Sequence, residues 1–163
     1  MSPTPTGRWT PTPTGGELIV SRTFRAPIED VWASVTESDR TARWFGPWKG
    51  DGRPGGTIQY QMVQEEGAPW SEAVIEACEP PRRLALTNPM AYLELRLSTV
   101  DAGTQLELVH HMPGPDGIGD FGPGWEFYLD ALVASRDGTP MPDFNDYYPS
   151  MRDYFTALAP AQG

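Results

Sequence analysis

The sequence predicts one α+β domain in which an antiparallel meander of strands packs against a long helix near the C-terminus. Four or five segments between residues 57 and 112 have the character of strands, and turn residues such as Pro80-Pro81 separate them. After this meander, apolar side chains recur at helical spacing in Trp125, Tyr128, Leu129 and Leu132. A chain of 163 residues has a suitable length for one such domain.

The first 16 residues differ in composition from the rest of the chain. The sequence Pro-Thr-Pro-Thr-Gly occurs twice there, and Trp9 is the only aromatic side chain. Proline fixes φ and lacks an N–H, so residues 1–16 are expected to be a disordered Pro/Thr-rich tail. We expect the folded domain to span residues 17–138. Residues 139–163 would form a C-terminal extension with a short helix packed on the domain.

A strand and two short helices are predicted to begin the domain. Residues 17–25 have the composition of a strand, and Pro27 then suits the first turn of a helix. Glu29 and Asp30 would lie at the positive end of the dipole of that helix. A second short helix is expected over residues 37–45.

Alternation along two of the later strands assigns their inward faces. Leu93, Leu95 and Leu97 alternate with polar residues, as a half-buried strand requires. Because neighbours on a strand point to opposite faces, the leucine pattern of the next strand turns His110 inward and His111 outward.

The strand predicted over residues 57–66 has two phases. In one phase the inward side chains are Ile58, Tyr60 and Met62. The opposite phase would turn two glutamines and a valine inward, which makes a poorer core. The long helix is expected to begin near Gly124, after a loop rich in Gly and Pro, and to run to about Arg136.

Charge and composition exclude several classes of partner. The formal net charge is -10 and the pI is about 4.5, so nucleic acid and anionic membrane surfaces would be repelled. Cys78 is the only cysteine, so an internal disulfide is excluded. Without an apolar run of about 20 residues or a signal-peptide pattern, we expect a cytoplasmic protein with no membrane insertion.

Local catalytic motifs are absent from the sequence. It contains no Gly-x-Ser-x-Gly, no phosphate-binding loop and no His-Glu-x-x-His. Two adjacent histidines and one cysteine do not supply the ligand spacing of a transition-metal site. We therefore expect a binding protein rather than an enzyme, with no catalytic residue, metal or cofactor.

Four local motifs, in this order along the chain, together carry a family resemblance. They are Arg-Ala-Pro-Ile-Glu-Asp-Val-Trp at 25–32, Arg-Trp-Phe-Gly-Pro at 43–47, Pro-Pro-Arg-Arg-Leu at 80–84 and Gly-Pro-Gly-Trp-Glu at 122–126. Over residues 17–138 the chain resembles the SRPBCC, or START-like, superfamily. Its branch is similar to the bacterial relatives of the heat-shock-protein-ninety ATPase activator. The resemblance implies a helix-grip fold, in which a curved antiparallel sheet of seven strands wraps round the long C-terminal helix, and a cavity that receives apolar ligands in many relatives.

The candidate ligand-binding residues are those expected to face this cavity. They are Trp44, Phe45, Tyr60, Met62, His110, Tyr128 and Leu132. Aromatic side chains give broad, stiff apolar walls suited to flat ligands. His110 has three interpretations: a hydrogen-bonded core residue, a polar contact for a ligand, or a general base. Trp32 and Trp125 are expected to fill the core.

Three functions remain as hypotheses at this point. The first is binding, sequestration or transport of a hydrophobic or aromatic small molecule, in natural-product biosynthesis or self-resistance if the ligand is a reactive natural product. The second is an enzyme of the polyketide aromatase or cyclase kind, and the third is a chaperone-linked interaction module. The expected partner is an apolar or aromatic small molecule, and a homodimer is left open.

Overall fold

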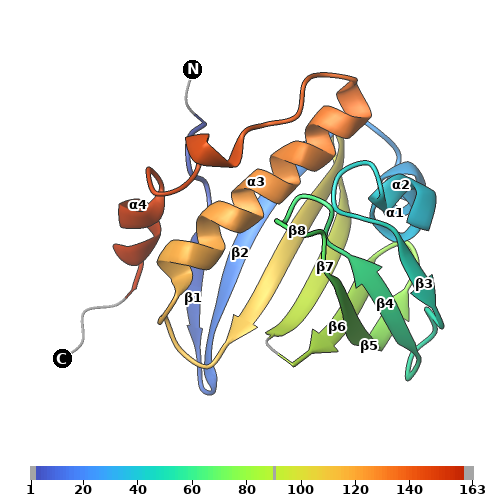
Figure 1. Cartoon of the computed structure of the whole chain (residues 1–163), viewed down its shortest axis with the longest axis horizontal. Coiled ribbons are helices and arrows are strands. Elements are labelled where there is room, and N and C mark those ends of the chain that lie inside the picture. The colour runs from blue at the N-terminus through green and yellow to red at the C-terminus, as the bar shows by residue number, and fades with distance from the viewer. Residues whose placement is uncertain (1–2, 90, 160–163) are drawn as a thin grey trace.

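The computed structural model describes residues 3–89 and 91–159. Over these residues the strands form a single eight-stranded antiparallel sheet in the order β1-β2-β8-β7-β6-β5-β4-β3. The sheet is strongly curved, and the long helix α3 lies diagonally across its concave side (Figure 1). This is the predicted α+β helix-grip architecture, with two short helices between β2 and β3.

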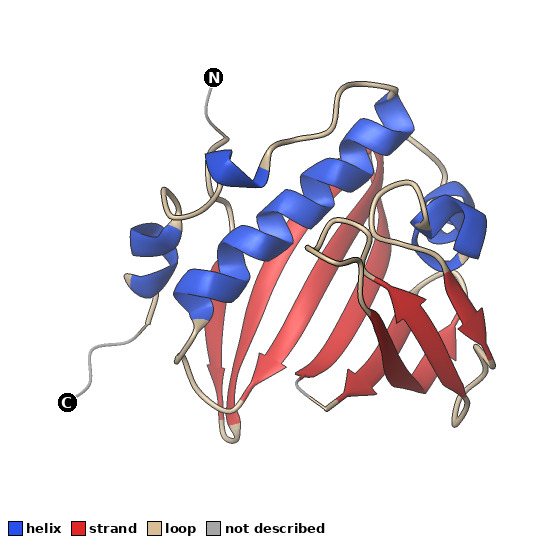
Figure 2. Ribbon diagram, in the orientation of Figure 1, coloured by secondary structure: helices blue, strands red, loops and turns tan. Residues whose placement is uncertain are grey.

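Along the chain, two strands precede two short helices, six consecutive strands follow, and the remaining helices come last. The strands are β1 Arg8–Thr12, β2 Gly15–Phe24, β3 Trp48–Gly50, β4 Thr57–Gln61, β5 Trp70–Glu79, β6 Arg83–Asn88, β7 Ala91–Val100 and β8 Gly103–Met112. The helices are α1 Ile28–Thr36, α2 Ser38–Thr41, α3 Ile118–Asp137, the 3-10 turn η1 Phe144–Asp146 and α4 Arg152–Thr156. Figure 2 shows that the helices gather on one side and at the rims of the sheet.

The N-terminal segment is not the disordered tail that its composition predicts. Residues 8–12 form β1, which pairs with β2 at the edge of the sheet and accounts for the eighth strand. An edge strand tolerates Pro11, because it has a neighbouring strand on one side only and the missing N–H can face away from that neighbour. Trp9 packs against the core, and its indole fills the space beside Gly16, where a Cβ would lie 2.2 Å from a ring atom.

A buried carboxylate on α3 also holds this segment. Glu126 is fully buried, and it accepts hydrogen bonds from the backbone N–H of Gly7 at 2.9 Å and from the hydroxyl of Thr6 at 2.9 Å. Arg22 of β2 donates to the same carboxylate at 2.8 Å and to Asp130 at 2.9 Å. A partner so far along the chain cannot be detected from local composition, which is why the tail prediction was wrong for these residues.

Helix α3 begins at Ile118, six residues before the predicted start near Gly124, and includes Pro123. Gly119 and Gly122 in its first turns allow close packing of the C-terminal extension. A Cβ on Gly122 would lie 2.3 Å from the ring of Phe155, which is fully buried on α4. The glycines of this segment predict a loop, but in the structure they belong to α3 and allow α4 to pack closely against it.

The first of the meander strands is shorter than predicted. It ends at Gln61, and residues 62–69 form a loop that turns back over the concave face instead of extending the strand. The N–H of Met62 donates to the carbonyl of Pro69 at 3.0 Å, which closes the base of the loop. This β4–β5 loop places polar residues above the sheet.

Two separate apolar clusters form the core. The larger one joins α3 and α1 to the inner faces of β2 and β8, and its fully buried members include Leu18, Val20, Leu106 and Leu129. The smaller one consists of Ile58, Ala73 and Ile75 on β4 and β5. Between them, Leu95 of β7 packs at the margin of the larger cluster and Leu84 and Leu86 of β6 pack at the margin of the smaller one, and these partly buried leucines contribute to the floor of the site described next.

Candidate functional site: a cavity between the sheet and the long helix

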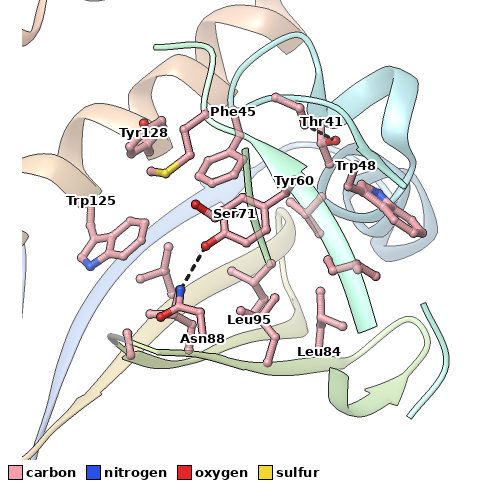
Figure 3. Close-up of a pocket in the computed structure, with 18 of the residues that line it drawn as sticks. Thr41, Phe45, Trp48, Tyr60, Ser71, Leu84, Asn88, Leu95, Trp125 and Tyr128 are labelled. Atoms are coloured by element: carbon pink, nitrogen blue, oxygen red, sulfur yellow. Dashed lines mark hydrogen bonds between the residues drawn. The ribbon is translucent and has the colours of Figure 1, made fainter. Parts of the chain in front are cut away.

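A cavity of about 1490 Å³ lies between the concave face of the sheet, α3, the α2–β3 loop and the β4–β5 loop. Figure 3 shows side chains of the sheet, of α3 and of the α2–β3 loop converging on it. Drug-sized ligands occupy cavities of about 300–1,000 Å³, so this cavity can enclose a polycyclic molecule.

The floor of the cavity is made of leucines. They are Leu84 and Leu86 on β6, Leu93 and Leu95 on β7, and Leu108 on β8. Alternation along each strand turns these side chains inward, as the sequence predicts for β7. The four leucines of β6 and β7 are nevertheless only half-buried, because α3 lies over β2 and β8 and leaves this part of the sheet uncovered.

An aromatic cluster forms the wall beneath the loops. Phe45 is its centre, with ring centroids 5.7 Å from Trp44, 5.7 Å from Tyr60 and 5.1 Å from Tyr128. In Figure 3, Phe45 stands between Tyr128 on the helix and Tyr60 on the sheet. The Trp44 indole N–H donates to the carbonyl of Ser34 at 2.9 Å, which fixes this side of the cluster to α1.

Two tyrosine hydroxyls of the wall are already hydrogen-bonded within the protein. The amide of Asn88 donates to the hydroxyl of Tyr60 at 3.0 Å, and the hydroxyl of Tyr128 donates to the carboxylate of Glu65 at 2.9 Å (Figure 3 draws the first of these). Burial, together with the charge of Glu65, raises the pKa of Tyr128 far above its ordinary value. Tyr128 therefore stays a neutral hydroxyl that ties the β4–β5 loop to α3.

His110 is the buried polar side chain at the other side of the cavity. It lies on β8 with 3% of its surface exposed, and its Nδ1 accepts a hydrogen bond of 3.1 Å from the indole N–H of Trp125. Burial, with a smaller contribution from neighbouring His111, lowers the pKa of His110 from 6.5 to about 4. At neutral pH the ring is therefore uncharged.

Six of the seven predicted residues lie in the cavity lining. Trp44, Phe45, Tyr60, Met62, His110 and Tyr128 come together there, and the apolar phase of β4 is the one that faces inward. Leu132 does not line the cavity. It is fully buried in the larger core cluster, one turn beyond Tyr128, where α3 packs directly on the sheet.

Several lining residues were not predicted as ligand contacts. Trp125 is half-buried and faces the cavity rather than only filling the core, and Asn88, Glu65 and Phe121 also contribute. The leucine alternation on β6 and β7 could have indicated the floor, but Glu65 depends on the unpredicted loop. Cys78 also lines the cavity, and burial followed by the charge of Glu79 raises the pKa of its thiol, which keeps it protonated.

Over the part of the chain that the structure describes, no group of three or more His, Cys, Asp or Glu side chains is arranged to hold a metal ion. None of the described helices combines the length and the hydropathy needed to cross a bilayer.

The curved sheet, the long helix and the cavity between them define a helix-grip protein of the SRPBCC superfamily. Residues 25–135 match the family of Activator of Hsp90 ATPase homolog 1-like proteins. The match covers more than half of the chain, so this protein belongs to that family. No curated protein matches the chain.

Solved structures share the fold over most of the chain. The crystal structure of CalU16 from Micromonospora echinospora is 30% identical with a TM-score of 0.74, and the match covers 95% of this chain and 96% of that chain. A Bordetella parapertussis protein, encoded by gene BPP1335, is 24% identical with a TM-score of 0.72, covering 95% and 93%. DynU16, a protein of the dynemicin biosynthetic locus, is 21% identical with a TM-score of 0.66, covering 78% of this chain and 50% of that chain.

Proposed function

We propose that this protein binds a hydrophobic or aromatic small molecule in the cavity and sequesters or carries it. The observation that carries the proposal is the floor of half-buried leucines on β6 and β7, which face inward into a cavity of about 1490 Å³. Apolar surface that stays accessible inside a folded protein is stabilised when an apolar ligand covers it, by about 25 cal/mol per Å². Aromatic walls around such a floor suit a flat ring system.

The proposed setting is natural-product biosynthesis or self-resistance. DynU16, which shares the fold, is a protein of a biosynthetic locus, and CalU16 is similar to this chain over nearly its whole length. A domain that encloses a reactive molecule would shield both the molecule and the cell from each other. The neighbouring genes test this part of the proposal, because their products define the compounds made beside this protein.

The cavity offers less support for an aromatase or cyclase. Such an enzyme needs a general base, whose pKa works best near the operating pH. His110 is the histidine that lines the cavity, but its pKa lies at about 4 and its Nδ1 already accepts from Trp125. A chaperone-linked interaction module, suggested by the family description, would become the better account if the cavity binds nothing.

A titration with planar aromatic probes tests the binding proposal. We expect saturable quenching of tryptophan fluorescence by naphthalene or fluorene, with the probe recovered at unchanged mass after incubation. Leu95→Trp adds bulk to the cavity floor and should abolish binding. Val74→Trp introduces the same indole at an exposed position of β5 outside the cavity lining, and should leave binding intact. If no planar probe binds to the wild type, the proposal is wrong.

A further inference from the structure

His110 lies at a fixed place beside the leucine floor. On β8 it pairs directly with Leu18 of β2 and Leu93 of β7, so apolar side chains flank it on both neighbouring strands. The edge of the Phe121 ring packs against the imidazole, with centroids 4.7 Å apart and planes at 75°. These contacts hold the ring in one orientation in the cavity wall.

The hydrogen bond from Trp125 decides which nitrogen of His110 carries the hydrogen. An indole N–H can only donate, so the Nδ1 atom that accepts from it must be unprotonated. A neutral imidazole has one N–H, which must then be on Nε2. The low pKa of His110 agrees with this assignment, because it keeps the second hydrogen off the ring at neutral pH.

The Nε2–H group of His110 has no hydrogen-bond acceptor among the described residues. In the same part of the chain, every side-chain nitrogen or oxygen that is sealed from open space does have a partner. Nε2 is therefore not sealed, and since His110 lines the cavity, this N–H opens into it. A donor that faces an apolar cavity and has no protein acceptor is stabilised when a ligand supplies one.

We infer that His110 uses its Nε2–H as a fixed donor to an uncharged acceptor, such as a ketone or quinone oxygen, on an apolar ring system bound in the cavity. This inference rests on the proposed binding function and names the chemistry of its ligand. It assigns His110 the role of selecting a ligand rather than of moving a proton.

The charges of the lining favour an uncharged acceptor over a carboxylate. Glu65, Glu66 and Asp120 are part of the lining, and its one lysine, Lys49, already stacks on Trp70 with 4.8 Å between the ammonium and the ring centroid. These carboxylates would repel a second negative charge in the cavity, and the repulsion is stronger near an apolar cavity than in bulk water. An anionic ligand would therefore be disfavoured even if its oxygen reached His110.

Fluorene and 9-fluorenone form a matched pair of probes, because they share one ring skeleton and differ by a single carbonyl. We expect the wild type to bind fluorenone about tenfold more tightly than fluorene, the effect of one hydrogen bond in an apolar site. In His110→Phe this preference should fall about tenfold, while fluorene binding is retained. His111→Phe makes the same change at the adjacent position, which faces the other side of the sheet, and should keep the preference.

An NMR measurement on the wild type tests the donor independently of any variant. Correlations between ring protons and ring nitrogens report which nitrogen of His110 carries the hydrogen, and we expect Nε2. Trp125→Phe removes the indole donor and should release this preference. A hydrogen on Nδ1 in the wild type, or an equal fluorenone preference in wild type and His110→Phe, would overturn the inference while leaving binding itself intact. If neither probe binds, the proposed function fails and the inference fails with it.

Discussion

Alanine should destabilise the protein less when it replaces a leucine of the cavity floor than when it replaces a leucine of the core. Leu129 on α3 is fully buried in the larger core cluster. Its replacement removes buried apolar surface and also leaves a void, so Leu129→Ala should cost about 2–5 kcal/mol. Leu93 on β7 lines the cavity, is only half-buried, and belongs to neither core cluster.

The smaller cost at Leu93 follows from what its side chain contacts. Alanine removes three carbons, worth about 0.8 kcal/mol each when fully buried, and a minor part of the Leu93 surface stays accessible in the folded protein. No new void forms, because the space beside Leu93 is empty already. We therefore expect Leu93→Ala to cost about 1.5–2 kcal/mol, without the additional cavity cost expected at Leu129.

Urea unfolding followed by circular dichroism measures both values, and equal denaturant slopes would show that the unfolded reference is unchanged. A saturating planar probe should stabilise the wild type more than Leu93→Ala, since the variant offers the ligand less apolar surface. Equal costs for the two variants would refute the reasoning. They would mean that in solution the sheet closes on α3 and buries Leu93 as completely as Leu129.

Three other perturbations address the helix contacts and the ionisable groups. Gly122→Ala should destabilise the protein by about 1–3 kcal/mol, because the added Cβ would meet Phe155. Gly124→Ala places its Cβ in open space and should stabilise α3 by up to about 1 kcal/mol. Urea unfolding compares the two variants, and equal effects would contradict the α3–α4 packing. Glu126→Gln should weaken the attachment of β1, seen as faster hydrogen exchange at the amide of Gly7, and an unchanged rate would argue against the anchor. Acid should destabilise the fold in two pH windows. The pKa of His110 is lowered from 6.5 to about 4, so the unfolded chain binds this proton first and stability falls as the pH drops from 6.5 to 4. The pKa of Glu94 is lowered from 4.5 to about 2, because hydrogen bonds from Arg96, Arg83 and His111 outweigh the opposing effect of burial, and stability falls further as the pH drops from 4.5 to 2. His110→Phe should flatten the upper window and Glu94→Gln the lower one in unfolding curves recorded from pH 7 to pH 2, and a wild-type curve without pH dependence would disprove both assignments.

The features that local sequence could predict are those set by strand periodicity and helix spacing. The alternation of Leu93, Leu95 and Leu97 gave the correct inner face of β7, and the same phase placed His110 in the cavity wall. Pro27 with its following acidic residues marked the start of α1, which begins at Ile28. These signals succeed because each depends on side chains only a few residues apart.

The features that were missed depend on contacts between distant segments. β1 exists because Glu126, more than 110 residues away, binds the backbone at Gly7, and no local pattern encodes that partner. The β4–β5 loop is held by the hydrogen bond between Tyr128 and Glu65, across 63 positions of sequence. Leu132 has the spacing of the inward stripe, but spacing alone does not tell where a helix lies against the sheet and where it stands away from it.

The division of the core into two clusters has an evolutionary consequence. The contacts that keep the chain folded lie mainly where α3 meets β2, β8 and the two terminal segments, whereas the floor leucines of β6 and β7 are buried members of neither cluster and pack at most at their margins. Substitutions on this floor can therefore change the shape of the cavity at little expense to folding. Gene duplication followed by drift at these positions would yield paralogues that keep one scaffold and diverge in the molecules they accept.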